Sequence, residues 1–137
     1  MAIKQGLCIS ARLDFLTGVH EPGDAYVIAL YTSVAEISPM TKSFTAKGEV
    51  RGAGYEPGGK LLSGWRCGVE GTTAWINWDD PEWVASVTAR GAMIYNTTKN
   101  YKALAILDFG SEFKSQNGKF KVNLPADGST ATIALGE

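Results

Sequence analysis

Polar and apolar residues alternate without exception in Lys119-Phe120-Lys121-Val122-Asn123-Leu124. A turn sequence, Pro125-Ala126-Asp127-Gly128-Ser129, follows, and the alternation resumes in Thr130-Ala131-Thr132-Ile133-Ala134-Leu135. Alternation of period two is typical of a strand buried on one face, because successive side chains point to opposite faces of a sheet. The end of the chain therefore predicts two half-buried strands of an antiparallel sheet.

The same type of pattern extends toward the N-terminus. Tyr26–Tyr31 and Lys102–Phe109 are apolar on both faces, which predicts two central strands. Further strands are expected at Phe44–Arg51, Lys60–Arg66, Ala74–Trp78, Trp83–Thr88 and Gly91–Asn96. About nine short strands with turns every 8–12 residues are typical of a sandwich or a barrel.

One short helix is expected near the N-terminus, with Ser10 as its cap, Leu13 and Leu16 on one face and Gly18 at its end. The fold class predicted for residues 1–137 is all-β: a single antiparallel β-sandwich domain, jelly-roll-like, closed at one end by this helix. The expected core residues are Ile28, Leu30, Ile76, Ile94, Ile106, Phe120, Val122 and Ile133.

Composition narrows the classes of function. The 137 residues carry 13 basic and 14 acidic side chains in no run of either sign, so nothing predicts nucleic-acid or membrane-surface binding. Cys8 and Cys67 are far apart in sequence, and two free thiols are favoured over a disulfide. The N-terminal residues lack an apolar segment of signal-peptide length, which predicts a protein made and retained in a reducing cytoplasm.

No motif predicts catalysis, a cofactor or a metal. Gly52–Gly59 resembles a phosphate-binding loop, but no Gly-Lys-Ser/Thr ends it, so a turn is favoured. Asp79, Asp80 and Glu82 could bind calcium or hydrolyse a glycoside, although Asp-Asp-Pro is also ordinary turn chemistry. His20, the single histidine, is expected in an exposed turn. The sequence therefore predicts a protein that is not an enzyme.

The tryptophans suggest a contact surface. Trp75 and Trp78 lie on opposite faces of one strand, so a buried Trp78 places Trp75 outward, under a loop, at an interface or on a sugar-binding platform. Loops on a rigid scaffold usually carry recognition, which favours Gly52–Gly59 and the turn at Asp79–Trp83. The expected partner-contact residues are Tyr55, Gly58, Gly59, Trp75, Asp80 and Trp83. The aromatic anchors among them are expected to be dispensable for folding.

Several motifs together resemble a known group of proteins. They are Gly18-Val19-His20, Ala29–Ser33, Gly48–Gly59 with its five glycines, Ala74-Trp75, Asp79-Asp80-Pro81-x-Trp83, Thr88–Ala92, Ile94-Tyr95-Asn96 and Asp108-Phe109-Gly110. In this order they resemble a family of small proteins encoded among the virion structural genes of tailed bacteriophages. The resemblance extends from about Gly18 to Leu135.

The resemblance implies a non-enzymatic role in the virion, reached by assembly in the host cytoplasm. The favoured role is capsid decoration: a cement protein, as a dimer or trimer, would bind the major capsid protein between capsomers and stabilise the shell by mass action. A neck, tail or fibre-attachment protein is the alternative within the virion. A carbohydrate-binding module that uses Trp75 or Trp83 is a third reading.

Overall fold

The computed structural model describes residues 3–135, and 41% of the chain is strand and 6% helix. One short N-terminal helix and antiparallel sheets make up the regular structure, as the sequence predicts. The elements are β1 (Gly6–Leu7), α1 (Ile9–Leu16), β2 (Tyr26–Tyr31), β3 (Lys60–Leu61), β4 (Arg66–Glu70), β5 (Thr73–Asn77), β6 (Glu82–Ala85), β7 (Thr88–Asn96), β8 (Lys102–Lys114), β9 (Gly118–Lys121) and β10 (Ile133–Leu135).

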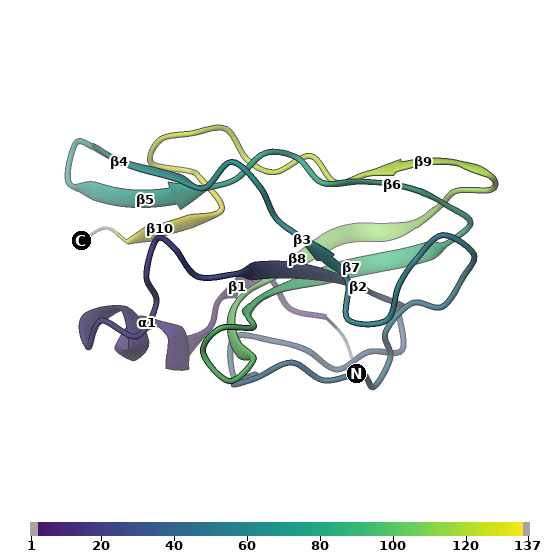
Figure 1. Cartoon of the computed structure of the whole chain (residues 1–137), viewed down its shortest axis with the longest axis horizontal. Helices are drawn as coiled ribbons and strands as arrows, with labels where there is room; N and C mark the ends of the chain where they lie inside the picture. The colour runs from purple at the N-terminus through teal and green to yellow at the C-terminus, as the bar shows by residue number, and fades with distance from the viewer. Residues whose placement is uncertain (1–2, 136–137) are drawn as a thin grey trace.

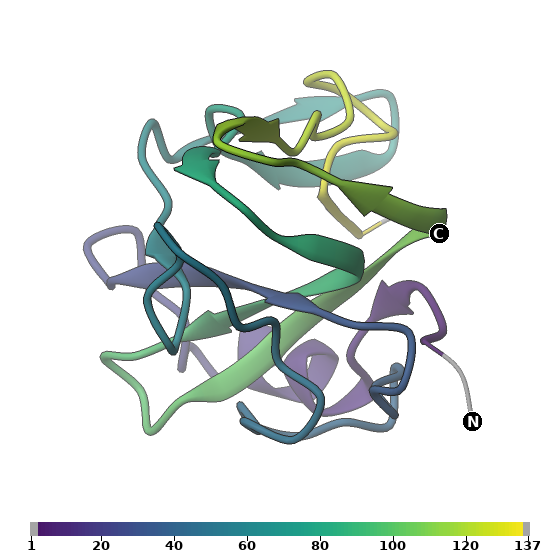
Figure 2. The ribbon, with the colours of Figure 1, turned by 90° about the vertical axis from the view of Figure 1, so that its right-hand side faces the viewer.

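The strands form three sheets that stack in layers. The largest sheet has the order β1-β8-β7-β2-β3, and two smaller sheets have the orders β10-β5-β4 and β6-β9. Both small sheets lie on one face of the large sheet, while α1 and the loop after β2 lie on the other (Figure 1). Figure 2 shows α1 and the β6–β9 pair on opposite sides of the large sheet. A jelly roll is not shown by this strand order, in which β7 and β8 form a hairpin at the centre of one sheet.

Two apolar cores explain why the central strands are apolar on both faces. Ile28 and Leu30 of β2 face the small sheets, where they pack in one core with Trp78, Phe120 and Ile133. The alternate residues of β2 face the other core, which holds Ala29, Tyr31, Met93, Ile106 and Cys8. The prediction of two central strands is therefore confirmed. Of the expected core residues all are buried except Ile76, which is partly buried and packs against the first core.

Several strand boundaries differ from the expected ones. Phe44–Arg51 is not a strand, because a turn with Gly48 at φ +83° interrupts it and only single bridges form at Ser43 and Glu49. Lys60–Arg66 contains only the two-residue β3 before β4 begins. By contrast, β8 continues to Lys114 through residues 110–114, which are all exposed and so carry no apolar alternation. A pattern of burial cannot reveal a strand that lies outside the core.

The helix forms where it is expected, although its details differ. Its cap is Cys8, with no side-chain hydrogen bond, rather than Ser10. Gly18 follows its C-terminus with φ +76°, as a residue that ends a helix often does. Leu13 and Leu16 face solvent, because the buried face of α1 is made by Ala11 and Asp14.

Candidate contact surfaces

Tyr55, an expected anchor on the surface, lies in the first core and is only 6% exposed. Its Oη accepts a hydrogen bond from the backbone N–H of Leu30 (2.9 Å) and donates one to Glu49 Oε2 (2.6 Å). Glu49 Oε2 also accepts from the N–H of Gly58 (2.7 Å). Burial raises the pKa of the Tyr55 hydroxyl, so it stays a neutral donor. The expected exposure of Tyr55 is therefore wrong: the residue fixes the glycine-rich loop to β2.

The glycines of this loop approach strands of the same chain. A Cβ on Gly59 would lie 2.1 Å from the carbonyl oxygen of Ile28 in β2. A Cβ on Gly52 would lie 2.1 Å from the carbonyl oxygen of Ser86, and one on Gly54 would lie 2.2 Å from that of Val84. Close backbone approach is a common use of glycine, and here it is satisfied within the chain. Gly58 and Gly59 are half-buried, and Tyr95 Oη donates a hydrogen bond to the Gly58 carbonyl oxygen.

The other expected contact residues divide between core and surface. Trp83 is 5% exposed, and its ring lies 6.2 Å from that of Tyr55 and 6.4 Å from that of Phe120, so its expected exposure is also wrong. Asp80 is exposed and accepts a hydrogen bond from the N–H of Leu124 (2.8 Å). Trp75 is half-buried and pairs with Gly68 of β4. Its indole occupies the space that a side chain at Gly68 would fill. Trp78 is buried, as expected.

An apolar surface that sequence reasoning missed lies along α1. Ile9, Leu13 and Leu16 are 54%, 62% and 84% exposed, and spacings of four and three residues place them on one helix face. Met40 is also exposed and follows Pro39, whose carbonyl oxygen accepts from the N–H of Ile9 (2.8 Å). These four residues are called the α1 row below, and the three on the helix, Ile9, Leu13 and Leu16, have the periodicity of a core-facing helix. Only the burial of the opposite face reveals that they point outward.

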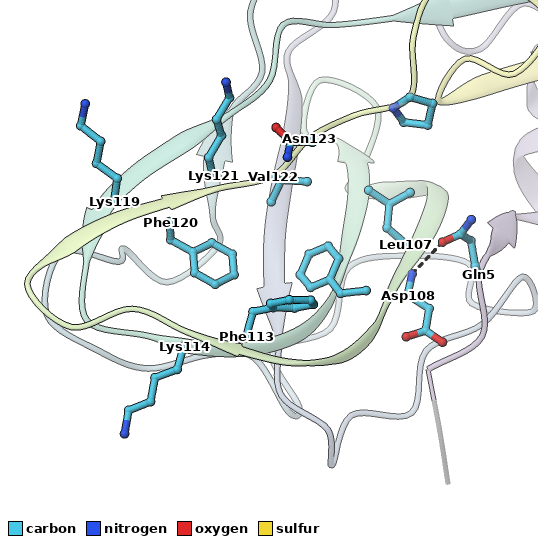
Figure 3. A pocket seen from close by; sticks show the side chains of 12 residues that line it. Gln5, Leu107, Asp108, Phe113, Lys114, Lys119, Phe120, Lys121, Val122 and Asn123 are labelled. Carbon is cyan, nitrogen blue, oxygen red and sulfur yellow. Dashed lines mark hydrogen bonds between the residues drawn. The ribbon is translucent and has the colours of Figure 1, made fainter.

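A cavity of about 560 Å³ opens between β8 and β9 (Figure 3). Its apolar wall is formed by Leu107, Phe109, Phe113 and Phe120. Lys114, Lys119 and Lys121 stand at its rim with their side chains directed away from the phenylalanines. Within residues 3–135 none of these lysines forms an ion pair. The sequence shows Lys119, Phe120 and Lys121 as ordinary strand alternation and predicts a loop at Gly110–Gly118, so it gave no signal of the cavity.

His20 is buried rather than exposed, which corrects the expectation of a turn position. Its side chain is inaccessible, with Nδ1 2.9 Å from Asn96 Nδ2 and Nε2 3.7 Å from Asp14 Oδ2. Desolvation lowers the pKa of His20 and outweighs the opposing attraction of Asp14 and Asp24. Lys99 and Lys102 lower this pKa further. The histidine thus belongs to a structural polar cluster beneath α1.

The acidic turn also has structural partners. Asp79 Oδ1 accepts a hydrogen bond from Arg66 Nη1 (2.9 Å), and Arg66 Nε also pairs with Asp127 (2.8 Å). Among the residues that the structure describes, no three His, Cys, Asp or Glu side chains form a group that could hold a metal ion. Cys8 and Cys67 are free, as expected.

The chain matches no known family model, no curated protein and no solved structure. Over residues 3–135, no helix has the length and apolar character needed to span a membrane.

Proposed function

We propose that this protein is a non-enzymatic structural protein of a tailed-phage particle, and that it decorates the capsid by binding the major capsid protein between capsomers. The α1 row is the observation that carries the proposal. Exposed apolar side chains that gather on one surface are typical of protein–protein contacts, whereas single exposed ones are ordinary. The motifs from Gly18 to Leu135 point to the same class of proteins.

The position of the α1 row suits a protein that bridges neighbours. Helix α1, which carries three of its four residues, lies on the opposite side of the large sheet from β9, whose residues line the β8–β9 cavity (Figure 1). Two separate contact surfaces on one small rigid body can join two subunits of a shell. Binding only to the assembled shell then stabilises it, and many symmetric copies supply avidity.

The test replaces Leu13 and Leu16 by aspartate and measures how many copies bind to particles that lack the protein. Both side chains are exposed, so the fold should persist while occupancy falls about tenfold or more. Val69→Asp, at an exposed site in β4, is the matched control. Light scattering on the same variants separates two uses of the row. If the variants form smaller oligomers than the wild type, the row mediates self-association into the dimer or trimer. If their size is unchanged and their occupancy falls, the row contacts the shell. Unchanged size together with wild-type occupancy would overturn the proposal.

A neck, tail or fibre-attachment role is the alternative within the virion, and copy number decides between them. Decoration requires on the order of hundreds of copies per particle, whereas a neck ring requires about a dozen. The jelly-roll assignment remains part of the proposal. Its support is the stack of antiparallel sheets around a common core, and it must accommodate the hairpin of β7 and β8.

A further inference from the structure

We propose that the cavity between β8 and β9 binds an extended segment of a partner protein as an added strand, with apolar and acidic side chains in alternation. This surface is separate from the α1 row. The inference goes beyond capsid decoration and holds whether or not that role is correct.

The backbone supplies the first argument, because two strand edges border the same cavity. β7 pairs with one edge of β8, but β1 pairs with the other edge only at Ala105 and Ile106. Gln5 Oε1 accepts from the N–H of Asp108 (3.0 Å), and in the described chain no strand covers that edge from there to Lys114. Unpaired strand edges are templates for another strand.

The edge of β9 is open in the same way. β9 pairs with β6 alone, from Glu82 opposite Lys121 to Ala85 opposite Gly118. Residues 119–123 line the cavity from this side, and residues 107–109, 113 and 114 line it from the β8 side. A strand entering the cavity would therefore meet backbone donors and acceptors on β8, on β9 or on both.

The side chains define what such a strand must carry toward the interior. The ring of Phe109 lies 6.4 Å from those of Phe113 and Phe120, so the three rings form one aromatic floor. Phe113 is 51% exposed, although it belongs to this cluster. Apolar side chains on the inner face of an added strand would cover these rings and remove their surface from water.

The opposite face requires acidic groups. Lys119 and Lys121 alternate with Phe120, and Lys114 follows Phe113, so each lysine points away from the floor (Figure 3). On a strand added to β9, the outer side chains would be cross-strand neighbours of Lys119 and Lys121, and on a strand added to β8 they would neighbour Lys114. None of these lysines has an ion pair in the described chain. Charge complementarity with the ammonium groups on either strand edge therefore selects aspartate or glutamate at alternate positions.

The experiment measures binding of capped synthetic peptides to the full chain by fluorescence anisotropy. The first probe alternates valine or phenylalanine with glutamate, and the second has the same composition in scrambled order. Two further probes keep the alternating sequence but carry backbone N-methyl groups, one along each edge of the peptide strand. The paired variant is Lys119→Glu with Lys121→Glu, and its control is Lys47→Glu, an exposed lysine outside the cavity.

We expect the alternating peptide to bind, and at least one methylated version and the paired variant to lose about tenfold or more in affinity. Lys47→Glu should bind as the wild type does. Amide hydrogen exchange should slow in residues 109–114 or 118–121 when the peptide binds. The proposal is overturned if the alternating peptide does not bind, if the scrambled peptide binds equally, or if both methylated versions bind undiminished. Binding of decanoate without binding of the peptide would also overturn it, because a fatty-acid anion uses the lysines and the aromatic floor but no strand edge.

Discussion

At the scale of single residues, two buried polar side chains, Tyr55 and His20, attach their loops to strands of the large sheet. Tyr55 and His20 stand in glycine- and proline-rich segments, which sequence rules place at the surface. Both are buried and hydrogen-bonded to residues outside their own turns, Tyr55 to Glu49 and Leu30 and His20 to Asn96. Sequence alone could not bring these partners together, since the contacts depend on how the loops return to the sheet.

Tyr55→Phe should lower the free energy of unfolding by about 1–3 kcal/mol, because it removes partners from the buried N–H of Leu30 and from Glu49. Urea denaturation followed by tryptophan fluorescence measures the loss. Tyr101→Phe, at a residue 56% exposed, is the control and should change stability little. Equal stability of the two variants would show that the Tyr55 hydroxyl contributes nothing. Tyr55→Ala should unfold the chain, contrary to the expectation from sequence that it would leave the fold intact.

His20 should make stability depend on pH near neutrality. Desolvation lowers its pKa in the folded state below the ordinary value of 6.5, so the folded protein binds the proton more weakly than the unfolded chain. The free energy of unfolding is therefore highest above pH 6.5 and should fall as the pH drops through this value. Denaturation midpoints measured from about pH 7.5 to about pH 5 test this, and His20→Asn should flatten the profile because the chain has a single histidine. A variant as steep as the wild type would assign the dependence to other groups.

At the scale of elements, the alternation of polar and apolar residues predicted the strands that border a core, but it did not predict the exposed end of β8 or the exposed face of α1. Ala74–Trp78 and Gly91–Asn96 correspond to β5 and to most of β7, since each presents apolar side chains to the interior. The exposed end of β8 and the outward row of α1 could not be predicted, because residues 110–114 carry no burial pattern and Leu13 and Leu16 carry a misleading one. The sequence thus located the scaffold and not the surfaces proposed here for contact.

Gly52→Ala should destabilise the loop between β2 and β3 where it approaches the end of β6. Its backbone angles suit any residue, but a Cβ would lie 2.1 Å from the carbonyl oxygen of Ser86, so the loop must move away from β6. We expect a loss of about 1–3 kcal/mol in the free energy of unfolding. Gly23→Ala is the matched control, because its Cβ would meet no atom within 4 Å. If both variants unfold at the same urea concentration, the close approach at Gly52 carries no cost.

At the scale of the whole molecule, the large sheet couples the two cores. β2 and β7 contribute alternate residues to each: Ile28 and Ile94 to the core under the small sheets, and Ala29 and Met93 to the core beneath α1. Neither core can lose its packing without exposing the strands that support the other. This arrangement accounts for the two-sided apolarity of Tyr26–Tyr31, from which the sequence predicted a central strand but not the nature of the covering layers.

We therefore expect both cores to unfold in one cooperative transition. The chain supplies a probe for each: Trp78 and Trp83 are buried in the first core, and Cys8 is buried in the second. Burial raises the pKa of the Cys8 thiol to about 12, so it should react with a disulfide reagent only after the second core opens. In a Cys67→Ser background, which removes the exposed thiol, pulse labelling of Cys8 and tryptophan fluorescence should give the same urea midpoint. Labelling of Cys8 at lower urea would show that the layer with α1 opens independently, and the large sheet would then fail to couple the cores.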